Sequence, residues 1–241
     1  MSKIISVIGS PGSGKTTVAF KLAQEVYLST TSGGVIYLSP SLKVPALGVL
    51  FPNYTPDSLF SLGKMLDKTD IYEEDVLNHL VTVKNMKNFG CIGYKAGENK
   101  YSYPNLTDDK VKALFDVLQK MVGYVFVDCS EEENDLISQY ALGRADEVIM
   151  VLSPDLKSMV YLASNENILG NHADRAIKIL NVNESELFSP IDDVRTNVKN
   201  ISYILPYSKQ IRGQHLDGLL YERTKDKKYC AEINKIVKNI V

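Results

Sequence analysis

Short runs of aliphatic and β-branched residues alternate along the chain with longer stretches in which apolar residues recur every three or four positions. The first pattern is typical of strands buried on both faces, and the second is typical of helices with one buried face. Six segments show the strand pattern clearly. The predicted strands are Ile4–Ile8, Val35–Leu38, Tyr124–Val127, Glu147–Leu152, Ala176–Leu180 and Ile201–Leu205.

Helical patterns lie between these strands. The clearest helix begins at Thr107, a good N-cap followed by two aspartates in the first turn, where carboxylates favour the helix dipole, and it ends at Gly123. We predict Pro40–Pro56 as a loop because it holds four prolines, and Phe89–Pro104 matches neither pattern. The other predicted helices are Val18–Val26, Asp57–Leu66, Glu73–Lys84, Glu132–Leu142, Asp155–Leu169 and Lys228–Val241.

The alternation of strands and helices predicts the fold class. Strands that are apolar on both faces and separated by helices favour a three-layer α/β/α domain around a mostly parallel, twisted sheet of about seven or eight strands. The chain of 241 residues shows no internal repeat, low-complexity tract or linker. We therefore expect residues 1–241 to form a single domain.

A glycine-rich segment separates the first predicted strand from the helix that follows. Residues 9–16, here called the phosphate loop, read G-S-P-G-S-G-K-T and match the pattern G-x-x-x-x-G-K-[ST]. Glycines let backbone N–H groups converge on phosphate, Lys15 would reach the β- and γ-phosphates, and Thr16 would ligate Mg²⁺. An ordinary glycine turn would not need lysine and threonine there. The predicted nucleotide contacts are Gly9, Ser10, Pro11, Gly12, Ser13, Gly14, Lys15, Thr16 and Thr17.

A carboxylate, Asp128, directly follows the predicted strand Tyr124–Val127. Ligands bind at the carboxyl ends of parallel strands, and an aspartate there can hold Mg²⁺ through a water. Taken alone, Asp128 would be read as a solvated or helix-capping residue. Together with the phosphate loop it predicts a metal site at Thr16 and Asp128, with Lys15 and Asp128 as the catalytic residues.

Composition and charge narrow the function further. Apolar residues make up 44% of the chain and the net charge is −2, which excludes global disorder and a broad basic surface for nucleic acid. The longest apolar run has five residues, whereas a membrane helix needs about 20. The N-terminus is too short and strand-like for a signal peptide, and the three cysteines form no pattern. We expect a cytoplasmic protein, and we predict neither nucleic acid nor membrane as a partner.

The order of the later motifs resembles the MinD/ParA-like ATPases, members of the SIMIBI class of P-loop proteins. The match covers motifs from the second half of those proteins. Asp128 corresponds to an aspartate at a strand end, Ala145–Asp146 to a pair before the next strand, and Pro154–Asp155 to the turn after that strand. Ile179–Asn181 resembles its strand ending in an adenine-reading Asn, and Ile204–Tyr207 its adenine-side loop. The resemblance implies that adenine lies near Asn181, Pro206 and Tyr207.

What the resemblance implies is an ATP- and Mg²⁺-dependent ATPase that acts as a switch for localisation, partitioning or assembly. Such a protein binds ATP and ADP, forms a nucleotide-dependent homodimer and acts on a protein partner, here unknown. Two departures bear on its activity: Ser10 replaces a lysine that reaches the partner subunit's phosphates, and Ser39–Ser41 replaces a D-x-D motif. Serine is a weak base, so we expect weak or partner-stimulated hydrolysis. Atypical members of the family, the TadZ/CpaE group, are similar in having incomplete versions of these catalytic motifs.

Two other classes stay open. The phosphate loop suits a P-loop kinase for a small molecule equally well, although such enzymes often clamp phosphate with arginines and the first arginine here is Arg144. The chain also fits a scaffold that binds nucleotide without turnover. Ser130 and Glu131 are candidates for orienting a water in place of the missing carboxylate.

The C-terminal segment Lys228–Val241 is amphipathic. The resemblance suggests membrane binding as one hypothesis for this segment, because MinD ends in a basic amphipathic helix that binds membrane. The segment is short, so we expect it to dock on the sheet.

Overall fold

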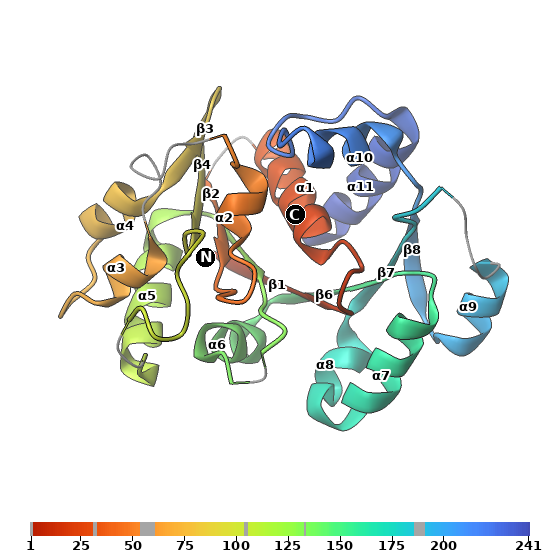
Figure 1. Ribbon diagram of the computed structural model, residues 1–241, viewed down its shortest axis with the longest axis horizontal. Coiled ribbons are helices and arrows are strands. Elements are labelled where there is room, and N and C mark those ends of the chain that lie inside the picture. Colours follow the sequence, from red (N-terminus) through yellow and green to blue (C-terminus); the bar gives the residue numbers. More distant parts are fainter. Residues whose placement is uncertain (1, 31–32, 54–60, 104–105, 133, 186–190) are drawn as a thin grey trace.

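The computed structural model describes residues 2–30, 33–53, 61–103, 106–132, 134–185 and 191–241. Within these residues the strands form one eight-stranded sheet in the order β3-β4-β2-β5-β1-β6-β7-β8 (Figure 1). The strands are β1 (Lys3–Gly9), β2 (Val35–Ser39), β3 (Val81–Val83), β4 (Met86–Gly93), β5 (Tyr124–Asp128), β6 (Glu147–Leu152), β7 (Ile177–Asn181) and β8 (Ile201–Leu205).

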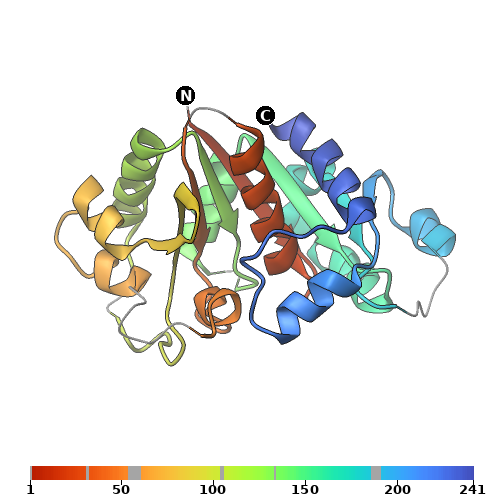
Figure 2. The same cartoon turned by 90° about the horizontal axis from the view of Figure 1, so that it is seen from above.

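Helices cover both faces of the sheet, which gives the three layers that the sequence predicts (Figure 2). One hydrophobic core joins the sheet to α1, α2, α10 and α11, and a second core joins its other face to helices α3–α9. The helices are α1 (Lys15–Ser29), α2 (Ala46–Leu50), α3 (Leu62–Leu66), α4 (Glu73–His79), α5 (Asp108–Met121), α6 (Leu136–Arg144), α7 (Leu156–Leu169), α8 (Asn171–Arg175), α9 (Ile191–Asn197), α10 (Lys209–Leu216) and α11 (Lys227–Ile240).

The sheet is parallel except at one edge. All neighbouring strands from β4 to β8 pair in parallel, and β3 pairs with β4 in the antiparallel sense. In the register, Val7 lies opposite Asp128 and Leu38 lies opposite Val127. The loops that follow β1, β2 and β5 therefore begin side by side at the carboxyl ends of these strands. The candidate site lies there.

The predicted helix Glu73–Lys84 is wrong in its second half. Helix α4 ends at His79, and Val81–Val83 forms the edge strand β3. Val81 and Val83 are buried while the residue between them is exposed, which is the alternation of a strand with one buried face. Antiparallel pairing with β4, which follows after two residues, decides the conformation here, so local helix propensity is overridden.

Three other predicted segments need correction. Pro40–Pro56 contains the short helix α2 rather than only loop. The helix predicted from Glu132 begins at Leu136, because the Asp135 carboxylate accepts a hydrogen bond from the Ser138 amide and caps the helix there. Part of the unassigned segment Phe89–Pro104 belongs to β4. The start of the predicted helix Asp57–Leu66 lies outside the described residues.

Helix α11 docks on the domain, as the sequence predicts. It packs against α1 and β8 and buries Ile233, Ile236 and Ile240. The Lys3 ammonium donates a hydrogen bond of 2.7 Å to the Ile240 carbonyl and ties the helix to the start of β1. In the described part of the chain, none of the helices combines the length and the apolar character needed to cross a bilayer.

A buried lysine joins α1 to α10 and to the segment that follows α10. The Lys21 ammonium donates to the side-chain oxygen of Gln214 at 3.0 Å and to the carbonyls of Leu220 at 2.7 Å and Glu222 at 2.5 Å. Burial disfavours the charged form and lowers the pKa of Lys21 to about 7.

We expect the free energy of unfolding to rise by about 1–2 kcal/mol between pH 7 and pH 8.5 because of Lys21. In this range the unfolded chain keeps a proton on Lys21 that the folded chain has largely lost, so raising the pH favours the folded state. Urea denaturation at several pH values measures the effect. The Lys21→Met variant should lack this rise, and an identical pH dependence in both proteins would contradict the role of Lys21.

Candidate nucleotide-binding site

The phosphate loop connects β1 to α1 and depends on glycine for its shape. Gly12 and Gly14 adopt positive φ angles of 77° and 81°, which favour glycine. A Cβ atom on Gly14 would also lie 2.6 Å from the side-chain nitrogen of Asn181. The loop therefore has the backbone conformation and close packing that bring N–H groups towards one point.

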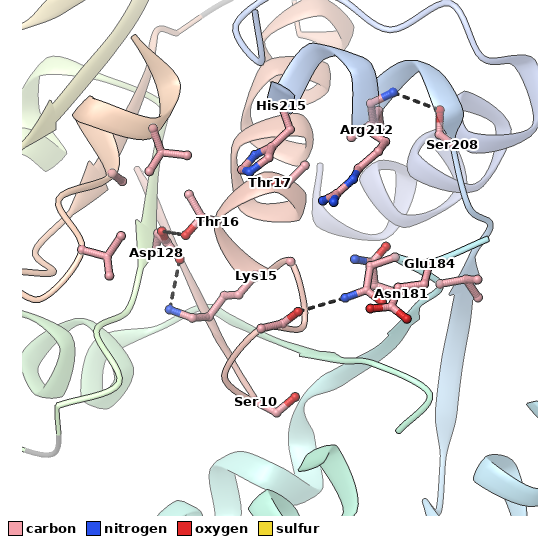
Figure 3. Close-up of a pocket in the computed structure, with 18 of the residues that line it drawn as sticks. Ser10, Lys15, Thr16, Thr17, Asp128, Asn181, Glu184, Ser208, Arg212 and His215 are labelled. Atoms are coloured by element: carbon pink, nitrogen blue, oxygen red, sulfur yellow. Dashed lines mark hydrogen bonds and ion pairs between the residues drawn. The ribbon is translucent and has the colours of Figure 1, made fainter. Parts of the chain in front are cut away.

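Lys15 points from the phosphate loop towards the end of β5 (Figure 3). Its ammonium lies 3.2 Å from the Asp128 carboxylate and also donates to the Cys129 carbonyl. Only 10% of the Lys15 side chain and 3% of the Asp128 side chain are exposed. Burial is the largest single effect and lowers the pKa of Lys15. The charge of Asp128, its hydrogen bond to Lys15 and smaller contributions such as the charge of Glu131 together outweigh burial, so the pKa lies above its ordinary value. The lysine is therefore a fixed positive charge at the point where the sequence predicts phosphate.

Asp128 is a shared acceptor at the centre of the site. Its second carboxylate oxygen accepts hydrogen bonds from the Thr16 hydroxyl at 2.7 Å and the Tyr37 hydroxyl at 2.9 Å. Burial, followed by the Asp128 charge, raises the pKa of Tyr37 well above its ordinary value, so Tyr37 remains a donor. Thr16 and Asp128 present oxygen atoms next to the phosphate loop. This donor set fits Mg²⁺, which prefers oxygen ligands and usually takes few of them from the protein.

Two asparagines, one at the end of β7 and one just after it, bind the other side of the phosphate loop. The Asn181 side-chain amide donates to the Ser13 carbonyl at 2.8 Å, and the Asn183 amide donates to the Gly12 carbonyl at 2.9 Å. Asn181 therefore orients the phosphate loop in addition to lining the region where the sequence predicts adenine.

Ser10 has a hydrogen-bonded partner on α7. Its hydroxyl lies 2.6 Å from that of Ser158, which lies 3.0 Å from the Ser153 hydroxyl, and Ser153 donates to the Asp155 carboxylate at 2.8 Å. Ser10 is 1% exposed and Ser158 is fully buried. Ser10, which stands where the MinD/ParA-like ATPases carry a lysine, is thus neutral, buried and hydrogen-bonded to the start of α7.

These elements surround a cleft of about 840 Å³, a size typical of small-ligand sites. Asp128 lines it, and Gly9, Pro11 and Ser13 are not among the lining residues. The other predicted contacts that line the cleft are Ser10, Gly12, Gly14, Lys15, Thr16, Thr17, Asn181, Pro206 and Tyr207.

Further lining residues escaped the sequence analysis. Lys43 comes from the loop after β2, and Arg212 and His215 come from α10, from which Figure 3 shows both side chains pointing down. No motif marks these segments, so only the fold brings them to the phosphate loop. Ser130 and Glu131, the candidates for orienting a water, also line the cleft.

Solved structures of ATPases share this fold over the whole chain. The ParA family ATPase from Chlorobium tepidum superposes with a TM-score of 0.78 at 15% identity, covering 100% of this chain and 99% of that protein. A putative plasmid partition protein from Borrelia burgdorferi bound to AMPPNP gives 0.74 at 15% identity, with 100% and 98% covered. MinD from Pyrococcus horikoshii with Mg-ADP gives 0.70 at 19% identity, with 100% and 96% covered.

The chain therefore has the P-loop fold of the ParA and MinD ATPases, as its motifs predict. No protein-family model matches it. A cytidylate kinase from Saccharolobus islandicus is 42% identical over 65 residues, which are 27% of this chain and 34% of the kinase. The matched region thus spans about a third of that curated relative.

Proposed function

We propose that this protein binds ATP with Mg²⁺ in the cleft and works as a nucleotide-dependent switch for localisation, partitioning or assembly. The observation that carries the proposal is the convergence of Lys15, Thr16 and Asp128 at one end of a phosphate loop in a ParA/MinD-type fold. Lys15 would hold the β- and γ-phosphates, and Thr16 and Asp128 would hold Mg²⁺, directly or through water. The metal would neutralise phosphate charge.

The topology supports one orientation of the nucleotide. Asn181 ends β7, and Pro206 and Tyr207 follow β8, on one side of the phosphate loop. Lys15 reaches towards Asp128 at the end of β5 on the other side. We place the base on the β7–β8 side and the terminal phosphate on the β5 side. Arg212 and His215 then lie on the nucleoside side of the cleft, because they belong to α10, and Tyr207 lies in the loop that leads into this helix.

We expect hydrolysis to be weak or stimulated by a protein partner. The loop after β2 offers Ser41 to the cleft where a carboxylate would position water, and serine is a weak base. Glu131, which lines the cleft, is the candidate carboxylate for this role in the described residues. The switch would act through a nucleotide-dependent homodimer or a partner whose interface follows the γ-phosphate.

Calorimetry with Mg-ATP and Mg-ADP, followed by a phosphate-release assay, tests the proposal. We expect the wild-type protein to bind both nucleotides and to release phosphate slowly. In Lys15→Ala, affinity should fall by about 100-fold or more, because a charge-assisted contact to phosphate is lost inside a largely buried site.

Lys112→Ala is the matched control, since it removes an exposed lysine paired with Asp116 on α5. It should bind like the wild type. Absence of nucleotide binding in the wild-type protein would contradict the proposal. Glu131→Ala with unchanged phosphate release would remove Glu131 as the water-orienting residue.

A second candidate function is a small-molecule kinase. The 65-residue match to a cytidylate kinase favours it, and the phosphate loop suits such an enzyme. Incubation with Mg-ATP and CMP, with the nucleotides separated by chromatography, discriminates the two functions. Formation of CDP at a rate above phosphate release would favour the kinase, and phosphate release that CMP leaves unchanged would favour the switch.

A further inference from the structure

At the end of the cleft where the terminal phosphate is expected, the Lys15 ammonium is already paired with the Asp128 carboxylate. Asp128 and Glu131 line this end, and Ser10, which lines it as well, carries no charge. A nucleoside triphosphate adds several negative charges. The site therefore needs cations beyond Lys15 and a metal ion if it is to distinguish a triphosphate from a diphosphate.

In the described part of the chain, the lysines and arginines that line the cleft are Lys15, Lys43 and Arg212. Arg212 belongs to α10 on the nucleoside side. Lys43 belongs to the loop after β2, and β2 lies next to β5 in parallel register, with Leu38 opposite Val127. Lys43 thus approaches from the same side as Asp128, where the phosphate chain ends.

Lys43 is held only loosely in the present arrangement. Its ammonium lies 3.9 Å from the Glu132 carboxylate, with 70% of the Lys43 side chain and 39% of the Glu132 side chain exposed. An exposed pair at this distance contributes little to stability, so a phosphate can replace Glu132 as the partner. Glu132 follows β5 in the loop that also contributes Ser130 and Glu131 to the cleft.

We propose that Lys43 binds the terminal phosphate of the bound nucleoside triphosphate from within the same chain, and so supplies the cation that the phosphate loop lacks at Ser10. Moving from Glu132 to phosphate would draw the loop after β2 towards the phosphate loop. The inference rests on the proposed function, because it requires that the cleft binds a nucleotide. On this proposal, Lys43 contacts a phosphate that a nucleoside triphosphate carries and a diphosphate lacks.

Calorimetry with Mg-AMPPNP and Mg-ADP on wild type, Lys43→Ala and Lys43→Arg tests this inference. Lys43→Ala should weaken AMPPNP binding by about 10-fold or more and change ADP binding by less than about twofold, because only the triphosphate carries the group that Lys43 contacts. Lys43→Arg keeps the charge and should remain close to the wild type. The Lys112→Ala variant, which breaks an exposed ion pair of the same kind on α5, controls for the loss of a surface lysine.

Each result separates the two proposals. Unchanged AMPPNP affinity in Lys43→Ala, or an equal loss for AMPPNP and ADP, would overturn the role of Lys43 while leaving nucleotide binding intact. A wild-type protein that binds neither nucleotide would overturn the proposed function and this inference with it. Because Lys43 is largely exposed, its replacement should leave the thermal midpoint unchanged, and thermal melting checks this.

Discussion

Replacing Asp128 with alanine should destabilise the protein by about 2–4 kcal/mol even without nucleotide. The Asp128 carboxylate accepts hydrogen bonds from Lys15, Thr16 and Tyr37 in a site that excludes most water. Its removal leaves a largely buried ammonium without its counter-charge and two hydroxyl groups without their acceptor. Lys15 keeps the Cys129 carbonyl, so the loss should fall below that of a fully orphaned buried charge. Urea denaturation measures the difference.

The same substitution should remove the Mg²⁺ dependence of nucleotide binding. Asp128→Asn serves as the matched variant, because asparagine fills the same space without the charge. It should cost less stability than alanine but lose the Mg²⁺ dependence to the same extent. If Asp128→Asn binds Mg-ATP as the wild type does, with the same response to EDTA, then Asp128 does not serve the metal.

Replacing Gly9 with alanine should destabilise the protein by about 3 kcal/mol or more. A Cβ atom on Gly9 would lie 2.1 Å from the Val151 carbonyl oxygen. That oxygen belongs to the backbone of β6, which pairs with β1 at this point of the sheet, so no side chain can rotate to make room. Because Gly9 also begins the phosphate loop, the shift of β1 should reduce nucleotide affinity as well.

Gly143→Ala is the control for this prediction. Gly143 lies on α6, and in the described part of the chain no neighbouring atom lies within 4 Å of the point that a Cβ atom would occupy. Alanine there should therefore be neutral or stabilise the protein by up to about 1 kcal/mol. Both variants are compared by urea denaturation followed by circular dichroism. Stabilities within about 1 kcal/mol of each other would mean that β1 and β6 can separate without cost.

The parts of the fold predicted correctly from the sequence are those in which local pattern and tertiary environment agree. The β1–loop–α1 unit has a β-branched strand, a glycine loop and a helical repeat in direct succession. By contrast, Val81–Val83 forms a strand only because β4 lies beside it, and no local signal separates it from the helix that precedes it. The short helix α2 follows Pro45, in a stretch whose prolines predict a loop.

The candidate site divides in the same way. Lys15 and Asp128 are far apart in sequence, but the rule that ligands bind at the carboxyl ends of parallel strands is enough to bring them together. No comparable rule applies to Lys43, Arg212 or His215, because they lie on a loop and a helix whose positions depend on the packing of the whole domain. Charged residues on such elements are indistinguishable in sequence from solvated ones.

The contact between Ser10 and Ser158 has a consequence for how sequences of this kind diverge. The two hydroxyl groups are buried against each other, and they join the phosphate loop to α7. A lysine at position 10 would need more space and a route to solvent, which a different residue at position 158 would have to provide. A change at position 158 alone would leave the buried Ser10 hydroxyl without its hydrogen-bond partner. The pair should therefore covary: homologues with lysine at the first position should rarely keep serine at the second.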